Sequence, residues 1–212
     1  KDGRAKLNAY IEDYANFADG LIGLYQVSGE ARYLAEAKRL ADAMITEFWD
    51  EENGGFYFTS NDHEELIVRN KDFYDNATPA GNSVAADVLL RLSKLYGEEK
   101  YERFAATVLR LTAPQVARHP QGFGRSLATI EFYLQPVKEV VIVGERGNDL
   151  ERELWSNYRP DIVSALSDGS KKEDLPLLKD RVTTVGKPTA YVCENFVCQH
   201  PVTTVEDMRE LL

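Results

Sequence analysis

The feature that most constrains the fold of this chain is an internal repeat. Residues 21–33 match residues 89–101, and the identities that recur 68 positions later are Leu21, Leu24, Gly29, Glu30 and Tyr33. Each copy has an apolar periodic segment, a Gly-Glu turn and a second periodic segment, which predicts two helices joined by a short turn. A repeat of helical hairpins is typical of a solenoid or a toroid.

The two helices of each hairpin differ in how much of their surface is apolar. Residues 31–49 and 98–112 carry one apolar stripe and one charged face, which predicts helices at the surface. Residues 8–27 and 79–96 are apolar nearly all round, as in helices buried between layers. In residues 79–96 the narrow polar stripe consists of Asp87, Arg91 and Lys94. An inner helix followed by an outer helix is the pattern of an (α/α) toroid.

Two further segments complete the expected helical region. Residues 54–59 and 66–69 predict short strands around a polar turn, and so a β-hairpin insertion near 55–69. A weaker third helical unit covers residues 126–134 and ends at Pro136.

After residue 136 the sequence period changes. Strands are expected at 140–144, 161–166 and 189–193, and helices at 149–158 and 205–212, the last with Thr203 or Thr204 as its N-cap. Strands that alternate with helices predict a small parallel α/β module. We therefore expect a mainly α chain, with a helical-hairpin (α/α)-toroid fragment at 1–136 and a small α/β module at 137–212.

Charge and composition exclude several classes of partner. The formal net charge of −10 argues against nucleic acid and anionic membranes, which would repel the chain. No apolar run is long enough for a transmembrane helix, and no signal peptide is recognised. The chain begins at Lys1 directly before a helical pattern, which indicates a fragment of a longer protein. We expect a cytoplasmic protein with no cofactor and no metal.

The two cysteines, Cys193 and Cys198, are too few for a disulfide scaffold. Their spacing differs from a thioredoxin-type Cys-x-x-Cys, and no second pair completes a zinc site. Buried structural thiols are the favoured interpretation, and a redox role is the alternative, which would require both sulfurs to be exposed and close together.

The start of the second inner helix admits two interpretations. Thr78 is a good N-cap, Pro79 suits the first helical position, and Gly81 lets another backbone or a ligand approach. Asn82 and Ser83 then fall in the first turn, near free N–H groups. The structural interpretation is a capped helix packed closely on a neighbour. The functional one is a polar rim at one end of a toroid, where such folds gather ligand-binding groups.

The functional interpretation gives a candidate carbohydrate site. Its acid/base groups would be Glu12, Asp13, Asp72 and Asp75, and its substrate-binding groups Tyr14, Asp19, Arg69, Lys71, Asn82 and Ser83. Glycoside hydrolysis needs two carboxyl groups about 5–5.5 Å or about 6.5–9.5 Å apart. Glu12 and Asp19 are separated by about 10 Å of helix, so a retaining pair would combine acids from both hairpins. The alternative role of each acid is a cap, a solvated loop or an ion pair with Arg69 or Lys71.

Several runs together resemble one protein family. They are EDYA at 12–15, FWD at 48–50, GGFYFT at 54–59, ATPAGNS at 77–83, and AYVC at 190–193 with Cys198, Pro201 and Val202. On these runs, over nearly the whole chain, the sequence resembles the C-terminal part of the YyaL-like thioredoxin-domain-containing proteins. That family is related to the spermatogenesis-associated thioredoxin-like proteins of animals.

The resemblance implies an N-terminal thioredoxin-like domain followed by an (α/α)6 toroid related to six-hairpin glycosidases and to N-acylglucosamine 2-epimerases. About three hairpins are present here, so the expected toroid is open and about half of the barrel. The related epimerases are expected to use histidines, but His63, His119 and His200 lie off the inner helices, which disfavours that chemistry.

The expected function is carbohydrate binding or processing, glycosidase-like if the domain is an enzyme. The expected partners are a sugar ligand and the N-terminal part of the same protein. The alternative is a non-catalytic scaffold that positions the thioredoxin-like domain and its partners.

Overall fold

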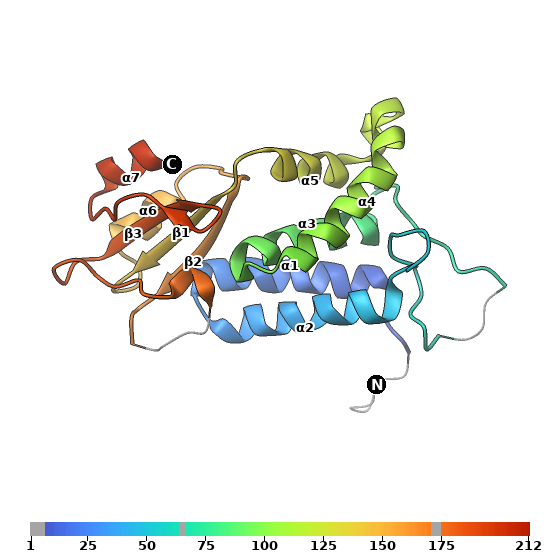
Figure 1. Ribbon diagram of the computed structural model, residues 1–212, viewed down its shortest axis with the longest axis horizontal. Coiled ribbons are helices and arrows are strands. Elements are labelled where there is room, and N and C mark those ends of the chain that lie inside the picture. Colours follow the sequence, from blue (N-terminus) through green and yellow to red (C-terminus); the bar gives the residue numbers. More distant parts are fainter. Residues whose placement is uncertain (1–6, 64–66, 171–174) are drawn as a thin grey trace.

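Helices dominate the first two thirds of the computed structural model, which describes residues 7–63, 67–170 and 175–212 (Figure 1). The helices of this region are α1 (Ile11–Ser28), α2 (Ala31–Phe48), α3 (Gly81–Tyr96), α4 (Glu99–Arg118) and α5 (Gly124–Leu134), with a short 3-10 helix (Pro120–Gly122) before α5. The expected pairs of helices, and the third unit, are confirmed. None of the helices in the described residues combines the length and the hydrophobicity that a membrane span requires.

The repeated Gly-Glu turns end α1 and α3 in the same way. Gly29 and Gly97 take left-handed conformations, with φ of 69° and 70°. Their N–H groups donate to Tyr25 O and Ser93 O, which satisfies a free carbonyl at each helix end. The repeat at 68 residues is therefore a repeat of helix ends that only glycine adopts without strain.

Helix α3 lies in the core, as its apolar sequence predicts. It packs against α1, α4 and α5, and its residues from Gly81 to Leu90 are all buried. The close approach expected at Gly81 is confirmed, because a Cβ there would lie 2.6 Å from Ile11 Cγ2 and 3.1 Å from the Glu12 nitrogen.

The predicted start of α3 is wrong by two residues. The N-cap is Ala80 and not Thr78, whose carbonyl instead accepts a hydrogen bond from the Asn76 N–H at 3.1 Å. The Ala80 N–H donates to Asp75 Oδ1 at 2.9 Å, so a side chain from the preceding loop binds this turn.

The β-hairpin expected near 55–69 does not form as a ladder in the described part of that segment. Phe56 makes an isolated antiparallel bridge to Trp49, and Phe58 N–H donates to Asn70 O at 2.7 Å. Leu66, placed in the second strand, lies outside the described residues. The ladder is absent at Phe56 because the Asn82 carboxamide binds both backbone groups of that residue. Its Oδ1 accepts from the N–H at 2.7 Å, and its Nδ2 donates to the carbonyl at 2.8 Å.

The remaining chain forms a four-stranded mixed sheet with two helices. Its elements are β1 (Lys138–Val143), α6 (Asp149–Leu154), β2 (Ile162–Ser167), β3 (Thr189–Glu194), β4 (Val197–Cys198) and α7 (Val205–Leu211). The strand order is β2-β1-β3-β4. Helix α6 ends four residues before the expected residue 158, whereas α7 is capped as expected by Thr204, whose Oγ1 accepts from the Asp207 N–H.

The expectation of a parallel sheet is correct for one pair of strands and wrong for the others. β1 and β2 are parallel and are joined through α6, whereas β3 runs antiparallel to both β1 and β4. Parallel strands need a crossover, usually a helix. The described chain between β2 and β3 supplies only a 3-10 turn (Pro176–Leu178).

The helices and the sheet share a hydrophobic core. The face of the sheet with Val141, Val143 and Val163 belongs to the same buried cluster as α1 to α4. The opposite face, with Val140 and Ile142, is covered by α6 and α7. Figure 1 shows the sheet beside one end of α1 and α3, and α5 on the other side of α3 from α2.

Candidate functional site

Three of the four predicted catalytic acids bind backbone N–H groups. Asp13 Oδ2 accepts from the Tyr10 N–H at 2.8 Å at the start of α1. Asp72 Oδ1 accepts from the N–H of Tyr74, two residues along the chain, at 3.0 Å. Asp75 Oδ2 accepts from the N–H groups of Arg125 and Ser126 at 2.9 and 3.1 Å, and so caps α5 from a distant segment. The fourth, Glu12, lies half-buried on α1.

Three predicted substrate-binding residues belong to the core. Asn82 and Ser83 are buried, and the Ser83 hydroxyl lies 2.9 Å from that of Ser126 on α5. The Tyr14 ring packs edge-on against Phe48, with ring centroids 5.2 Å apart. Ser83 and Tyr14 thus contact neighbouring helices, and Asn82 binds the loop that precedes α3.

Lys71 and Arg69 bind groups of the loop that follows α2. Lys71 Nζ lies 2.6 Å from Asp50 Oδ2, and the Tyr57 hydroxyl donates to the same oxygen at 2.8 Å. The Lys71 contact lowers the pKa of the Asp50 carboxyl well below its usual value, against the effect of burial. The Arg69 guanidinium stacks over the Tyr57 ring at 4.2 Å. This end of the helices is therefore filled by paired charges and an aromatic ring.

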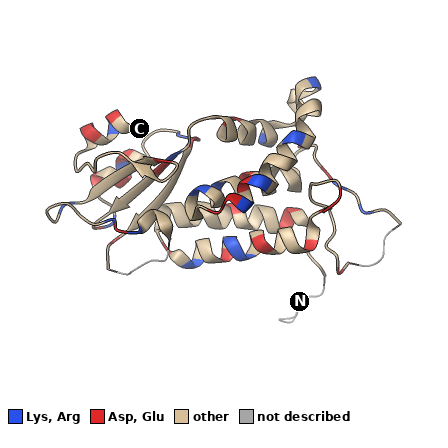
Figure 2. Ribbon diagram, in the orientation of Figure 1, with Lys and Arg blue, Asp and Glu red and all other residues tan. Residues whose placement is uncertain are grey.

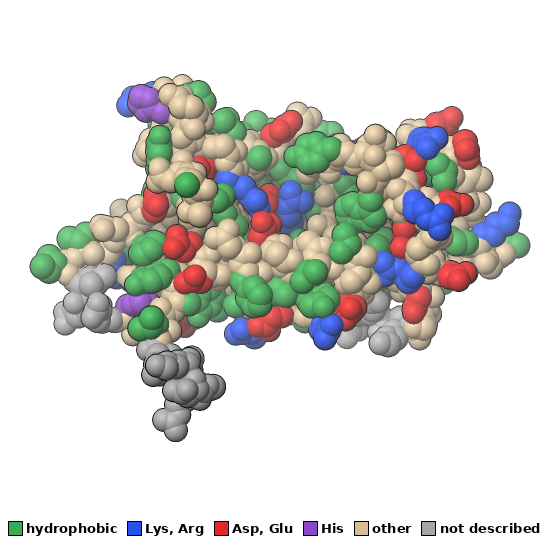
Figure 3. All heavy atoms as spheres, turned by 180° about the vertical axis from the view of Figure 1, so that it is seen from behind, with side chains coloured by type: hydrophobic (Ala, Val, Ile, Leu, Met, Phe, Trp, Pro, Cys, Tyr) green, Lys and Arg blue, Asp and Glu red, His purple; other side chains and the backbone are tan. Residues whose placement is uncertain are grey.

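A cavity of about 600 Å³ lies elsewhere, between α1, α3, α5 and the segment before β2. Its walls comprise Asp19, Ile22, Gly23 and Gln26 of α1, Asp87 and Arg91 of α3, Arg125, Ala128, Glu131 and Phe132 of α5, and Gln135, Tyr158, Pro160 and Asp161. Asp19 is the one residue of the predicted site that lines it. Figure 3, which views the molecule from behind Figure 1, shows a hollow with acidic and basic side chains gathered inside it.

Two arginines and two aspartates form an ion-pair network in this cavity. Arg125 Nη2 lies 3.0 Å from Asp19 Oδ1 and 2.6 Å from Asp87 Oδ2. Arg91 Nε lies 3.0 Å from the same Asp87 oxygen, and its guanidinium stacks over the Phe132 ring at 4.7 Å. Burial by itself lowers the pKa of the Arg125 guanidinium, but Asp87 and Asp19 together raise that pKa above its ordinary value.

This network contrasts with the charges on the outer helices. Figure 2 shows acidic and basic residues interspersed along α2 and α4. There, exposed pairs such as Arg39 with Glu36 bridge neighbouring turns of one helix. The Arg125 network instead connects three helices, and the Asp87 carboxylate at its centre is only 5% exposed. Charges that are held by partners on several helices and line a cavity are better placed to orient a ligand than exposed pairs on one helix.

Part of this network was detectable in the sequence. Asp87 and Arg91 are spaced i,i+4 in the polar stripe of a helix that is otherwise apolar, and such a stripe needs a buried polar partner. Arg125 carries no comparable signal. Its contacts depend on how α5 packs against α3 and faces α1 across the cavity, which a local pattern does not determine.

The cysteines differ from the favoured expectation of separate buried thiols. Cys193 and Cys198 form a disulfide, and they are paired across the ladder of β3 and β4. The spacing of four intervening residues suits a hairpin with a two-residue turn, which places the two cysteines opposite each other.

Comparison with known proteins relates the chain to one part of larger proteins. The human and mouse proteins called spermatogenesis-associated protein 20 are each 32% identical to it over 212 residues, covering 96% of this chain and 27% of theirs. "Uncharacterized protein B0495.5" of Caenorhabditis elegans is 26% identical over 216 residues, and the match covers 100% of this chain and 29% of the length of that protein. No protein-family model matches the sequence. The chain thus spans about a quarter of the length of these relatives, consistent with a part of a larger protein.

Proposed function

We propose that the helical region is a carbohydrate-binding domain and that the cavity between α1, α3 and α5 is its sugar site. The observation that carries the proposal is the arrangement of Asp19, Asp87 and Arg125, two carboxylates held at one guanidinium inside a cavity. Sugar hydroxyls both donate and accept hydrogen bonds. Carboxylates accept and guanidinium groups donate, so neighbouring hydroxyls can be bound by alternating partners.

The size and lining of the cavity support a small polar ligand. Its volume of about 600 Å³ lies within the range of about 300–1,000 Å³ that is usual for ligand pockets. Gln26 and Gln135 add amide groups that both donate and accept. Tyr158, which is 90% exposed, offers an aromatic ring on which the apolar face of a sugar ring can stack.

The contacts favour binding over hydrolysis. Asp19 and Asp87 are each paired with Arg125, so the structure places their oxygens at a hydrogen-bond donor. A glycosidase also needs a carboxylic acid that holds a proton for the leaving group. Asp13, Asp72 and Asp75 bind backbone N–H groups instead, so the predicted acid pair has no support from the geometry.

The proposal is tested by thermal unfolding of the full-length protein with a panel of mono- and oligosaccharides. At a hundred times its dissociation constant, a bound sugar stabilises the fold by about 2.7 kcal/mol. For a domain of this size that raises the Tm by about 2–4 °C per kcal/mol. We expect the shift in the wild type and in Asp72→Asn, and its loss in Asp19→Asn and Arg125→Lys.

Asp19→Asn and Asp72→Asn make the same chemical change at the cavity and at the predicted rim. A shift lost in Asp72→Asn but kept in Asp19→Asn would place the sugar at the rim. No sugar-specific shift with any member of the panel would contradict carbohydrate binding.

A scaffold is the second candidate, and one observation favours it. Helix α1 carries an exposed apolar stripe of Phe17, Leu24 and Val27, which are 60%, 47% and 53% exposed. At about 100° per residue the stripe lies about 140° around the helix from the face that lines the cavity. The relatives have nearly three quarters of their length outside the match. We propose that a helix from the rest of the full-length protein covers this stripe.

A further inference from the structure

We infer that the Cys193–Cys198 pair is a thiol–disulfide exchange site, in which Cys198 is the sulfur that reacts with an external dithiol or its disulfide. The pair lies in the hairpin of β3 and β4, where Cys193 and Cys198 face each other across the ladder. Asn195 and Phe196 form the turn and both have positive φ, at 50° and 63°. The ladder pairing places the two cysteines opposite each other, at the separation that a disulfide requires.

The two sulfurs differ in access. Cys193 is 1% exposed and packs in the core of the sheet, whereas Cys198 is half-buried on the edge strand β4. Thiol–disulfide exchange requires an attacking thiolate to reach one sulfur directly. Because Cys193 is enclosed, an external thiol can reach only Cys198. The exchange therefore needs one reachable sulfur and not two exposed ones: the half-buried Cys198 reacts, and the enclosed Cys193 resolves the mixed disulfide.

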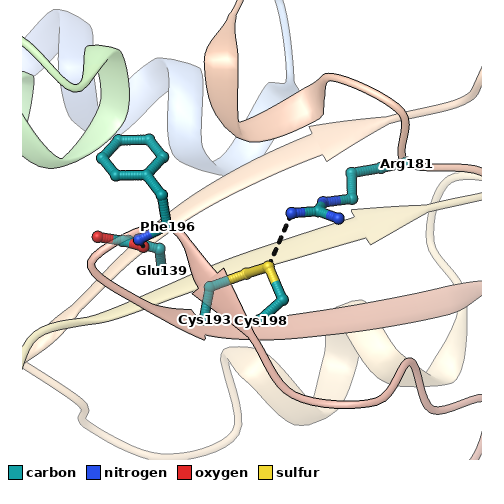
Figure 4. The surroundings of a disulfide bond; sticks show 5 residues. All are labelled: Glu139, Arg181, Cys193, Phe196 and Cys198. Atoms are coloured by element: carbon teal, nitrogen blue, oxygen red, sulfur yellow. Dashed lines mark hydrogen bonds between the residues drawn. A yellow bond between two sulfur atoms is a disulfide. The ribbon is translucent and has the colours of Figure 1, made fainter.

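A positive charge touches the reachable sulfur. Arg181 Nη2 donates to Cys198 Sγ at 2.8 Å, and its guanidinium is held over the Tyr191 ring at 5.0 Å (Figure 4). A fixed cation beside a thiol favours the thiolate, which is the reactive form. Figure 4 shows Arg181 and the Phe196 ring on opposite sides of the disulfide, so the cation is directed at the sulfur and not at the hairpin turn.

The reaction balances with an external disulfide as the oxidant. In the reduced pair the Cys198 thiolate attacks one sulfur of the external disulfide. The external S–S bond breaks, and a mixed disulfide and a free thiolate result. The Cys193 thiol gives its proton to that thiolate and attacks Cys198 Sγ, which forms the Cys193–Cys198 bond and releases the second external sulfur as a thiolate. The pair loses two electrons and the external disulfide gains them. An external dithiol runs the same steps in reverse.

The hairpin turn connects this pair to the helical region. Phe196 N–H donates to Glu139 Oε2 at 2.7 Å, and Lys94 Nζ donates to Asn195 Oδ1 at 3.2 Å. A Cβ on Gly97 would lie 3.1 Å from the Phe196 ring, so the ring packs on the turn between α3 and α4. We therefore expect amide hydrogen exchange at residues 194–198 to rise when the pair is reduced.

The test uses the full-length protein and follows this one pair by mass spectrometry of alkylated peptides. After reduction with dithiothreitol, iodoacetamide at pH 7 should label Cys198 at least tenfold faster than Cys193. Arg181→Met should slow labelling of Cys198 by about tenfold, because the thiolate loses the cation beside it. Arg181→Lys should restore most of the rate, and the control Arg209→Met should change nothing.

A trapping experiment tests the order of the two steps. With oxidised glutathione, Cys193→Ser should accumulate the glutathione adduct on Cys198, whereas Cys198→Ser should leave Cys193 unmodified. Equal labelling of the two cysteines, or a Cys198 rate insensitive to Arg181→Met, would overturn the proposal. A pair that excess dithiothreitol reduces only after the protein unfolds would also overturn it and leave a purely structural disulfide.

Discussion

At the scale of single residues, the carboxamide of Asn82 takes the place of a neighbouring strand for Phe56. It binds both backbone groups of that residue and also donates to Asp72 O at 2.9 Å. A buried residue in the first turn of a helix thus fixes a loop that precedes it by 26 positions. Asn82 was correctly predicted in that turn, where the sequence left its side chain as part of a packed helix start or as a ligand-binding group. The hydrogen-bonding partner of a buried amide is set by tertiary packing, which local patterns do not contain.

Glu139 gives a residue-scale prediction about pH. Its side chain is 0% exposed, and Oε1 has no hydrogen-bond partner among the described residues. Burial raises the pKa of this carboxyl, and the Phe196 N–H only partly opposes that effect. A raised pKa means that folding favours the protonated form. The stabilising contribution is therefore complete below the ordinary carboxyl value and is lost as the pH rises through the raised pKa.

Glu139→Gln removes this titration and keeps the shape of the side chain. We expect the free energy of unfolding of the variant, relative to wild type, to increase between pH 5 and pH 8. Each unit by which folding raises the pKa corresponds to about 1.4 kcal/mol. Urea unfolding at several pH values measures the effect, and Glu194→Gln, an exposed neighbour, is the control. Parallel pH profiles for the wild type and Glu139→Gln would contradict the argument.

At the scale of elements, the sequence determined what the backbone does locally. The helical hairpins, the glycine turns that end α1 and α3, and the positions of β1, β2 and β3 were all predictable from period and turn chemistry. The direction of β3 was not, because antiparallel pairing depends on the connection from β2 and not on the strand itself. The cap of α5 was also hidden, since Asp75 lies about 50 residues before the N–H groups that it binds.

Two glycines test how closely α1 and α3 approach. At Gly81 a methyl group would meet Ile11 and the Glu12 backbone, whereas at Gly20 no heavy atom lies within 4 Å. We expect Gly81→Ala to destabilise the fold by about 1–3 kcal/mol through overpacking. Gly20→Ala should stabilise it by about 0.5–1 kcal/mol, because alanine favours the helix. The midpoints of urea unfolding measure both, and shifts in the same direction would contradict the packing argument.

At the scale of the whole molecule, the candidate site arises from the arrangement of three helices and not from one motif. The cavity forms where α5 returns across α1 and α3, and Arg125 makes the connection between their aspartates. The inner helices and the polar stripe of α3 were predictable from the sequence. The predicted site lay at the helix ends, because capping residues and ligand-binding residues are the same polar types. Only the folded arrangement separates the two roles, since caps are directed at backbone and the cavity residues at one another.

The exposed stripe of α1 leads to a prediction about the full-length protein. If a helix from the rest of the protein packs on Phe17 and Leu24, then a lysine substituted at either position would be buried in that contact. We expect Phe17→Lys and Leu24→Lys each to lower the free energy of unfolding of the full-length protein by about 2–4 kcal/mol, comparable with the loss of a buried apolar side chain. The matched control is Val68→Lys, at an apolar residue that is 65% exposed in a loop. Thermal unfolding compares the three variants. If Phe17→Lys and Leu24→Lys destabilise the protein no more than Val68→Lys does, the stripe is not covered and the scaffold is contradicted.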